Sequence, residues 1–379
     1  MKTEVKTIAF YLPQYHPIPE NDKAYGKGFT EWTNVKKAKP LFENHYQPRI
    51  PYNSDYYSLL DLDTMKRQIT LAKENGIYGF CYYHYWFTGG IKLLEKPIER
   101  MLKHPELDMP FCLCWANENW TKKWDGGNNE IIVKQSYGNE EDLDNHVDYL
   151  CDFFKDERYI KIDGMPLLII YRPNLIPKIR NVIHRIRERV KQNGFKGVKI
   201  AIQHPQYYVE GVNLQLFDYY IQFQPLFVQI DNREKEMSRF LHMIKKTLIR
   251  FGMKGLRNLL GELKNKYICS HEDTLVHRNY DEDWEKILSY KSSDKKLIAG
   301  AFVDWDNTPR NRNGLVYDGA SPEKFGIYFK RLVKKVEREY DEKFIFINAW
   351  NEWAEGAYLE PDEKYGYNYL DKLKQAINN

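Results

Sequence analysis

The run Phe344-Ile-Phe-Ile-Asn-Ala-Trp-Asn-Glu-Trp-Ala-Glu-Gly356 holds the most structural information in this chain. Its first four residues are β-branched or aromatic, and they predict a buried strand. Two glutamates, Glu352 and Glu355, follow where that strand ends, in a stretch that is rich in tryptophan and otherwise uncharged. Because α/β enzymes keep their sites at strand ends, these glutamates are candidate catalytic residues.

Short apolar runs recur along the chain and are separated by amphipathic or polar segments. They span residues 7–12, 76–83, 110–115, 166–171, 198–203, 219–222, 297–303 and 344–348. Eight strands that alternate with helices predict an α/β chain folded as a (β/α)8 TIM barrel, whose usual size of about 250 residues leaves room for long loops at the C-terminal face. A doubly wound sheet is the alternative, although no Gly-x-Gly-x-x-Gly follows the first run. We expect one catalytic domain over residues 1–379.

Two of the intervening segments are typical of helices. Asp63 is expected to cap the first helix, which should end at Gly76. Its apolar face is formed by Met65, Ile69 and Ala72. Ser321-Pro322 is expected to open the second helix. Its core side chains are Phe325, Phe329, Leu332 and Val336.

The composition fits a large globular protein. With 379 residues, 42% of them hydrophobic, the chain can bury a sizeable core. A net charge of +4 from 57 basic and 53 acidic residues gives no general attraction for nucleic acid, and none is expected as a partner. No apolar run approaches the roughly 20 residues of a membrane-spanning helix. The first residues enter a predicted strand almost at once, without a leader segment, so we expect a cytoplasmic protein.

The five cysteines are expected to be reduced. Their number is odd, and Cys81, Cys112 and Cys114 lie inside apolar runs, which is typical of buried thiols rather than of a disulfide framework. The spacing Cys112-Leu-Cys114 does not match a zinc site, and no His-x-His or His-Glu-x-x-His occurs. We therefore expect no metal and no cofactor.

One part of the chain departs from the repeat, and a helical insertion is expected at residues 230–290. Residues 233–267 contain ten Lys or Arg against three Glu. One interpretation is a helical excursion that packs on the barrel and exposes a basic face. The other is a pair of basic amphipathic helices that makes a peripheral contact with the inner membrane surface or a lipid phosphate. Liposome sedimentation with and without anionic lipid tests the second interpretation.

The residues that follow the predicted strands are mostly aromatic or polar. Pyranose rings present apolar C–H faces flanked by hydroxyls, so a sugar site needs flat aromatic walls with polar side chains at their edges. The candidate sugar-binding residues are Tyr11, Gln14, His16, Glu31, Trp32, Tyr83, His84, Trp86, Trp115, Asn117, Glu118, Trp120, Tyr171, Arg172, Gln203, His204, Gln222, Asp304, Trp305, Asp306, Asn351 and Trp353. For any single aromatic residue, capping of the barrel is an equal alternative, and Asp304 with Asp306 also resembles an ordinary turn.

The spacing of Glu352 and Glu355 suits acid–base chemistry. Residues three apart on a helical turn have Cβ atoms about 5 to 6 Å apart, close to the roughly 5 to 5.5 Å carboxyl spacing of retaining glycosidases. Burial among tryptophans is expected to raise the pKa of one carboxyl, and the charge of the other raises it further. The pair would then hold one acid and one base. Two glutamates at an exposed helix start are the alternative.

Several long motifs resemble known families. Asn351-Glu-Trp-Ala-Glu-Gly356 with Leu359-Glu-Pro361 is similar to the motif near the C-terminus of glycoside hydrolase family 99, the endo-α-mannosidases and endomannanases. The chain resembles more closely the related WbsX family, which is named for glycosyltransferases of bacterial surface polysaccharide and O-antigen biosynthesis. The WbsX-like segments are Tyr11-Leu-Pro-Gln-Tyr-His16, Gly28-Phe-Thr-Glu-Trp32, Trp115-Ala-Asn-Glu-Asn-Trp120 and Trp305-Asp-Asn-Thr-Pro-Arg310. Only the basic insertion lies outside the resemblance.

The resemblance implies a (β/α)8 barrel and metal-independent chemistry on an α-glycosidic bond. By motif, Glu352 would be the base that activates the sugar 2-hydroxyl to attack its own anomeric carbon, which gives a 1,2-anhydro intermediate. Glu355 would be the acid and then the base at the leaving oxygen. Family 99 commonly has His where this chain has Ala354. The contact of that imidazole is missing here, so the resemblance does not extend to mannose specificity.

Three functional hypotheses follow. The first is a retaining enzyme that acts on an oligosaccharide or lipid-linked glycan, either by glycosyl transfer in surface polysaccharide (O-antigen or capsule) biosynthesis or as an endo-acting, endo-α-mannosidase-like hydrolase. The second is a non-catalytic glycan-binding barrel. Tight glycan binding that is unchanged in Glu355→Gln, with no product formed, would favour this hypothesis. The third is a metal-dependent barrel hydrolase, which a chelator would inactivate.

Overall fold

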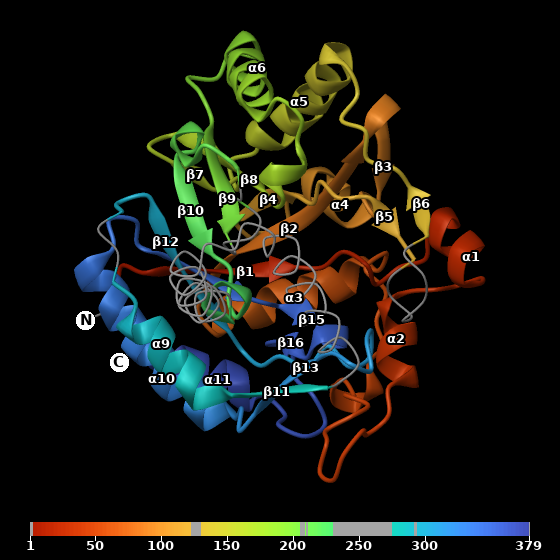
Figure 1. Ribbon diagram of the computed structural model, residues 1–379, viewed down its shortest axis with the longest axis vertical. Coiled ribbons are helices and arrows are strands. Elements are labelled where there is room, and N and C mark those ends of the chain that lie inside the picture. Colours follow the sequence, from red (N-terminus) through yellow and green to blue (C-terminus); the bar gives the residue numbers. More distant parts are fainter. Residues whose placement is uncertain are drawn as a thin grey trace, which may run out of the picture.

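The computed structural model describes residues 3–122, 130–204, 209, 211–229, 275–291 and 294–378. In these residues eight parallel strands form a closed barrel (Figure 1). Their order is β1, β14, β12, β10, β9, β8, β4 and β2, and β2 pairs again with β1. The strands are β1 (Lys6–Tyr11), β2 (Ile77–Phe87), β4 (Phe111–Trp115), β8 (Met165–Ile170), β9 (Lys199–His204), β10 (Tyr219–Gln222), β12 (Leu297–Phe302) and β14 (Phe344–Asn348).

The predicted barrel is confirmed, and closure of the ring excludes the doubly wound sheet. The strand bounds differ from the predicted runs by at most one residue, except that β2 continues four residues further. Nearly every residue of the barrel strands is buried. Strands of a parallel barrel are covered on both faces, so they form continuous apolar runs in the sequence.

Figure 1 shows α5 and α6 at one side of the barrel and α9, α10 and α11 at another. Helices α5 and α6 pack on each other, and α10 packs on both α9 and α11. The described helices are α1 (Pro19–Tyr25), α2 (Glu31–Lys37), α3 (Leu62–Glu74), α4 (Lys96–Lys103), α5 (Glu140–Phe154), α6 (Ile179–Gln192), α9 (Tyr280–Ser289), α10 (Pro322–Glu339) and α11 (Asn368–Asn378).

Short strands and single helical turns build the loops. The short strands are β3 (Ile91–Leu93), β5 (Trp120–Thr121), β6 (Ile131–Val133), β7 (Lys161–Ile162), β11 (Val276–Asn279), β13 (Leu315–Asp318), β15 (Asn351–Glu352) and β16 (Ala357–Tyr358). The 3-10 turns are η1 (Tyr52–Ser54), η2 (Thr88–Gly90), η3 (Pro173–Leu175), η5 (Leu214–Leu216) and η6 (Trp353–Glu355).

The two helix predictions had different outcomes. Helix α10 begins as predicted, because Ser321 is its N-cap and accepts a hydrogen bond from the backbone N–H of Lys324. Its four predicted core residues are buried. The predicted cap of α3 was wrong, because Asp61 rather than Asp63 is the N-cap and accepts from the Asp63 backbone N–H. An N-cap side chain binds an N–H two or three residues ahead, which places the cap two residues earlier.

The predicted basic segment, residues 233–267, lies outside the described residues. The described end of the expected insertion, from residue 275, contains β11 and α9. Four cysteines, Cys81, Cys112, Cys114 and Cys151, are buried and unpaired, as expected for core thiols. Among the described residues no helix combines the length and the apolar character needed to cross a membrane.

Candidate active site

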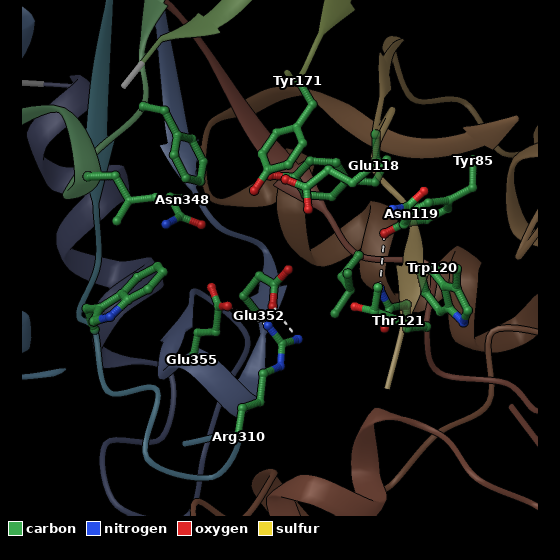
Figure 2. Close-up of a pocket in the computed structure, with 17 residues that line it drawn as sticks. Tyr85, Glu118, Asn119, Trp120, Thr121, Tyr171, Arg310, Asn348, Glu352 and Glu355 are labelled. Carbon is green, nitrogen blue, oxygen red and sulfur yellow. Dashed lines mark hydrogen bonds and ion pairs between the residues drawn. The ribbon is translucent and has the colours of Figure 1, made fainter. Parts of the chain in front are cut away.

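A cavity of about 300 Å³ lies at the C-terminal end of the barrel strands. Residues at or shortly after the strand ends form its walls (Figure 2). The lining residues are Leu12, Gln14, Tyr83, Tyr85, Ala116, Glu118, Asn119, Trp120, Thr121, Tyr171, Phe223, Leu226, Trp305, Arg310, Asn348, Glu352 and Glu355. From the predicted set, the structure brings Gln14, Tyr83, Glu118, Trp120, Tyr171, Trp305, Glu352 and Glu355 to this cavity.

The two glutamates lie on a tight turn directly after β14. Glu352 ends β15, and Glu355 ends the single 3-10 turn η6. Gly356 closes this turn with φ +65°, and a Cβ there would lie 3.0 Å from Arg49 and from the backbone N of Asp306, so only glycine fits. The expected helical turn is a 3-10 turn between two short strands. Both carboxyl groups still face the cavity (Figure 2).

The guanidinium of Arg310 binds three carboxyl groups. Nη2 donates to Glu352 Oε2 at 3.1 Å, and Nη1 donates to Glu355 Oε1. Nε donates to Glu31 Oε1 at 3.0 Å. The Glu31 side chain is fully buried and does not line the cavity. Arg310 belongs to the loop between β12 and β13. One cation therefore joins this loop to α2 and to the turn after β14.

The electrostatics of the pair favour retention of a proton. Burial raises the pKa of Glu352 well above its usual value, Arg310 lowers it, and the charges of Glu355 and Glu31 raise it. Burial likewise raises the pKa of Glu355, Arg310 lowers it, and Glu31 raises it. Interacting carboxyls lose their protons in steps that belong to the pair. The site can thus hold one proton at pH values where an exposed glutamate is ionised.

The wall opposite the pair is built on Glu118 and Tyr171 (Figure 2). Arg172 Nη1 donates to Glu118 Oε1 at 2.5 Å, and the Glu118 side chain remains 35% exposed. Asn117 connects the loops after β4 and β8, because its Oδ1 accepts from Arg172 N and its Nδ2 donates to Arg172 O, both at 2.8 Å. Asn117 and Arg172 therefore hold this wall in place without lining the cavity.

Strand β2 supplies a second, aromatic wall. Tyr83 and Tyr85 line the cavity, whereas His84 and Trp86 face α5. There, His84 Nε2 lies 2.9 Å from His146 Nε2, and Trp86 stacks on the same imidazole. Successive side chains of a strand point to opposite faces. The predicted strand ends at residue 83, but β2 continues to Phe87, so His84 and Trp86 belong to the strand and lie away from the cavity.

Three more predicted residues point outward, between the barrel and its helices. The Tyr11 hydroxyl donates at 2.6 Å to Gln68 of α3. Trp115 Nε1 donates to the backbone of β2 at 3.3 Å. Gln222 Oε1 accepts from the Tyr340 hydroxyl at 2.9 Å. Each of these side chains is buried on the outer face of its strand, so none of them lines the cavity.

Four further predicted residues, which are His16, Trp32, Gln203 and His204, do not line the cavity. Burial lowers the pKa of His16 to about 4. Trp32 packs in an aromatic cluster that includes Trp353, between the two glutamates. Gln203 Nε2 donates to the hydroxyl of Tyr83 at 3.2 Å. His204 packs edge-on against two aromatic rings.

Asp304 and Asp306 face away from the cavity into a buried polar cluster. Arg49 Nη2 donates to Asp304 Oδ2 at 2.8 Å, and His45 Nε2 lies 2.9 Å from Asp306 Oδ2. The backbone N–H of Asp306 donates to Glu355 O at 2.7 Å. These contacts fix the loop after β12 against the turn at residues 351–356, and neither of these predicted substrate-binding residues lines the cavity.

Asn351 and Trp353 are buried and support the turn at residues 351–356. Asn351 Oδ1 accepts from the backbone N–H of Leu12 at 2.8 Å. Trp353 Nε1 donates to Glu360 Oε2 at 2.7 Å. Ala354, between the two glutamates, is fully buried. These contacts anchor the turn to the start and the end of the chain without lining the cavity.

The most important residue missing from the predicted site is Arg310. It stands eight residues after the end of β12 and closes the WbsX-like segment Trp305-Asp-Asn-Thr-Pro-Arg310, but it was not among the predicted sugar-binding residues. Charge balance is the signal that could have indicated Arg310, because two buried glutamates at the C-terminal end of the barrel require a cation nearby. Other lining residues that were missed are Leu12, Tyr85, Ala116, Asn119, Thr121, Phe223, Leu226 and Asn348. Among the described residues no group of three His, Cys, Asp or Glu side chains is arranged to hold a metal ion.

The fold and the site together define a (β/α)8 barrel whose cavity has the paired glutamates and aromatic walls of carbohydrate-active enzymes. Residues 7–373 match the family described as Glycosyltransferase WbsX. The chain belongs to this family of carbohydrate-active enzymes.

Two curated relatives are each named uncharacterized protein WxcX. They come from two strains of Xanthomonas campestris pv. campestris, ATCC 33913 and B100, and both are 35% identical to this chain, over 378 and 380 residues. The match covers 98% of this chain and 49% of each relative. The chain therefore spans about half the length of the curated relatives it matches.

Solved structures share the fold at low identity. The GH99 endo-alpha-mannosidase from Bacteroides thetaiotaomicron, in complex with bis-tris propane, has a TM-score of 0.56 at 11% identity, over 98% of this chain and 96% of that chain. A second structure, of a glycoside hydrolase-like protein, has a TM-score of 0.54 at 14% identity, over 100% and 95% of the two chains. These likenesses establish the barrel fold.

Proposed function

We propose that this chain is a retaining enzyme that transfers a sugar by breaking and making an α-glycosidic bond, in the assembly of a bacterial surface polysaccharide. The supporting observation is that Glu352 and Glu355 face one cavity and share the guanidinium of Arg310. The family description as a glycosyltransferase supports transfer. The fold likeness to an endo-alpha-mannosidase supports a retaining site of this kind.

The first chemical step releases the leaving group. The carboxylate of Glu352 takes the proton of the donor sugar 2-hydroxyl, and the 2-oxygen attacks the anomeric carbon. The bond from that carbon to the leaving oxygen breaks, and the leaving oxygen takes the proton of Glu355. The product is a 1,2-anhydro sugar, with Glu352 protonated and Glu355 ionised.

The second step reverses these roles. Glu355 takes the proton of the acceptor hydroxyl, whose oxygen forms a bond to the anomeric carbon. The bond from that carbon to the 2-oxygen breaks, and the 2-oxygen regains its proton from Glu352. Two inversions leave the α configuration unchanged. Water in place of the acceptor gives endo-acting hydrolysis, the second candidate, which the fold likeness to the endo-alpha-mannosidase favours.

The cavity walls suit an oligosaccharide or a lipid-linked glycan. Tyr83, Tyr85 and Trp305 offer aromatic surfaces for the apolar faces of sugar rings. Glu118, on the opposite wall, offers an exposed carboxylate to sugar hydroxyls. The retaining pair therefore lies at the base of a site with aromatic and polar walls. A non-catalytic glycan-binding barrel would use the same walls without turnover.

The test is incubation with surface-polysaccharide intermediates of the host and with α-manno-oligosaccharides, followed by mass spectrometry. We expect longer glycans when an acceptor is present, and the loss of all products in Glu355→Ala with glycan binding retained. Glu363 is an exposed glutamate after the turn at residues 351–356. Glu363→Gln is the matched control and should keep full turnover. Free reducing sugar as the only product would assign hydrolysis. Unchanged turnover in Glu355→Ala would refute the assignment of the pair.

A further inference from the structure

Glu31 is a buried acid that the proposed chemical steps do not use. It is the first residue of α2, and its side chain is 0% exposed. Its backbone N–H donates to Gln14 O at 3.1 Å, which ties α2 to the loop after β1. The buried position excludes direct contact with a sugar in the cavity. The carboxyl group must therefore act through its neighbours.

The neighbours of Glu31 connect it to the catalytic pair. Oε1 accepts from Arg310 Nε at 3.0 Å and from Asn34 Nδ2 at 3.3 Å. Oε2 is buried, with no hydrogen bond to any described residue. The other two edges of the same guanidinium are bound to Glu352 and Glu355. Arg310 thus lies between Glu31 and the reacting carboxyls.

We propose that Glu31 is a positioning residue that holds Arg310 and whose negative charge keeps a proton on the catalytic pair. This inference rests on the proposed function, because it assigns to the pair the roles of acid and base. One arginine balances the charge of one carboxylate, so ionisation of both Glu352 and Glu355 leaves one negative charge unbalanced even without Glu31. A third carboxylate on the same cation leaves the cluster further short of positive charge, so one of the pair retains its proton.

The other titratable groups that face the cluster do not change this balance. Tyr15, from the loop after β1, and Tyr83 and Tyr85, from β2, have pKa values raised by burial, so they stay neutral. Glu118, on the opposite wall, is paired with Arg172. The charge that distinguishes this site from a simple pair with one arginine is therefore that of Glu31.

The experiment compares pH profiles of kcat/KM for the wild type, Glu31→Gln and Glu31→Asp. Glutamine has nearly the same shape and keeps an oxygen for Arg310, but it lacks the charge. The pKa values of both catalytic glutamates should fall, so both limbs of the profile should move to lower pH by at least about one unit. Aspartate keeps the charge. Its profile should stay at the wild-type position, even where the shorter side chain lowers the rate.

A merely structural role predicts a different result. If Glu31 only supports the structure, Glu31→Gln should lower kcat at every pH and leave both limbs of the pH profile at their wild-type positions. That result would overturn the proposal. Titration of ¹³Cδ-glutamate signals by NMR reads the same pKa values without turnover. If the wild type has no activity on any glycan, a downward shift of the Glu352 and Glu355 signals in Glu31→Gln still supports the charge coupling. Unshifted signals in a folded variant refute it independently of the proposed function.

Discussion

Arg310 Nη2 lies 3.1 Å from Glu352 Oε2, and this contact joins the loop after the seventh barrel strand to the turn after the eighth. The same guanidinium continues to Glu355 and to Glu31. The cation is only 15% exposed. A buried ion cluster of this kind is strongly destabilised when one member is removed, because the remaining charges keep no partner.

The 2-hydroxyl of the donor sugar is required by the proposed steps. A donor that is identical except for a 2-deoxy position should bind in the cavity and give no product, because no oxygen is available for the attack on the anomeric carbon. Glu352→Gln should reproduce this loss on the natural donor, with a fall in kcat of roughly 10²-fold or more. Both are measured by product formation in mass spectrometry, with affinity from calorimetry. Normal turnover of the 2-deoxy donor would instead indicate direct attack by a carboxylate.

Replacement of Arg310 should change both stability and pH dependence. Arg310→Met leaves the carboxylates without a counter-charge, so we expect a loss of about 3 to 5 kcal/mol at neutral pH. Arg310 lowers the pKa of Glu352 and of Glu355, so its removal raises both. The stability loss should therefore be smaller at pH 5 than at pH 8, because the carboxyls protonate more readily in the variant. Urea unfolding at both pH values measures it. Arg312→Met, an exposed arginine of the same loop, should change neither quantity.

Asp306 should contribute to acid stability. Burial raises its pKa, but the contacts with His45, Arg49, Thr308 and Gln47 lower it to about 2. Because the folded pKa lies below the usual 3.8, the stabilisation is complete above about pH 4 and disappears as the pH falls through about 2. The difference between the folded and the usual pKa of Asp306 corresponds to about 2 kcal/mol in the free energy of unfolding.

Asp306→Asn tests this contribution. The wild type should be more stable than the variant by about 2 kcal/mol at pH 6, and the difference should shrink near pH 2. Thermal or urea unfolding measures both. Asp318→Asn, in an exposed pair with His277, is the control and should cost little. A difference that stays constant from pH 6 to pH 2 would show that packing rather than charge is lost.

Glu360 should make stability fall as the pH rises from about 4.5 to neutral. Burial raises its pKa to about 7, although Trp353, Tyr57 and Gln68 donate hydrogen bonds to it. Since the folded pKa lies above the usual 4.5, the folded chain binds a proton that the unfolded chain has released. The contribution of Glu360 to the free energy of unfolding should decrease by about 3 kcal/mol as the pH rises from about 4.5 to about 7.

Glu360→Gln should remove that decrease. Comparison of its urea unfolding with that of the wild type at pH 5 and pH 8 isolates the effect. Relative to the variant, the wild type should lose about 3 kcal/mol between these two pH values. Glu363→Gln, at an exposed glutamate, should follow the wild type. Parallel pH curves for the wild type and Glu360→Gln would contradict the raised pKa.

The barrel could be predicted from the sequence because its strands are buried on both faces. Apolar runs such as 344–348 and 219–222 coincide with β14 and β10 without any shift. Helix caps were less certain, as Asp61 shows, because two neighbouring aspartates fit the same pattern. A local pattern identifies an element better than its first residue.

The site could be predicted only in part. Glu352 and Glu355 lie directly after a strand, so their place at the mouth follows from the topology. In β2, Tyr83 faces the cavity and His84 faces outward, because the strand continues past both residues. The end of this strand could not be predicted, because aromatic residues continue without a break through it. Asp304 and Arg310 belong to one loop, yet one faces a buried cluster and the other faces the cavity. Such side-chain directions depend on contacts with distant segments.

Closure of the barrel gives the chain a built-in order of assembly. Glu31 follows the first strand, whereas Glu352 and Glu355 follow the last, and β1 pairs with both β2 and β14. The charge cluster can form only after the two ends of the sheet have met. A growing or partly folded chain therefore lacks the cluster, and under the proposed function it would lack the acid that the first step requires. Under the proposed function, activity would therefore appear last in folding, and its onset would report that the ring is complete.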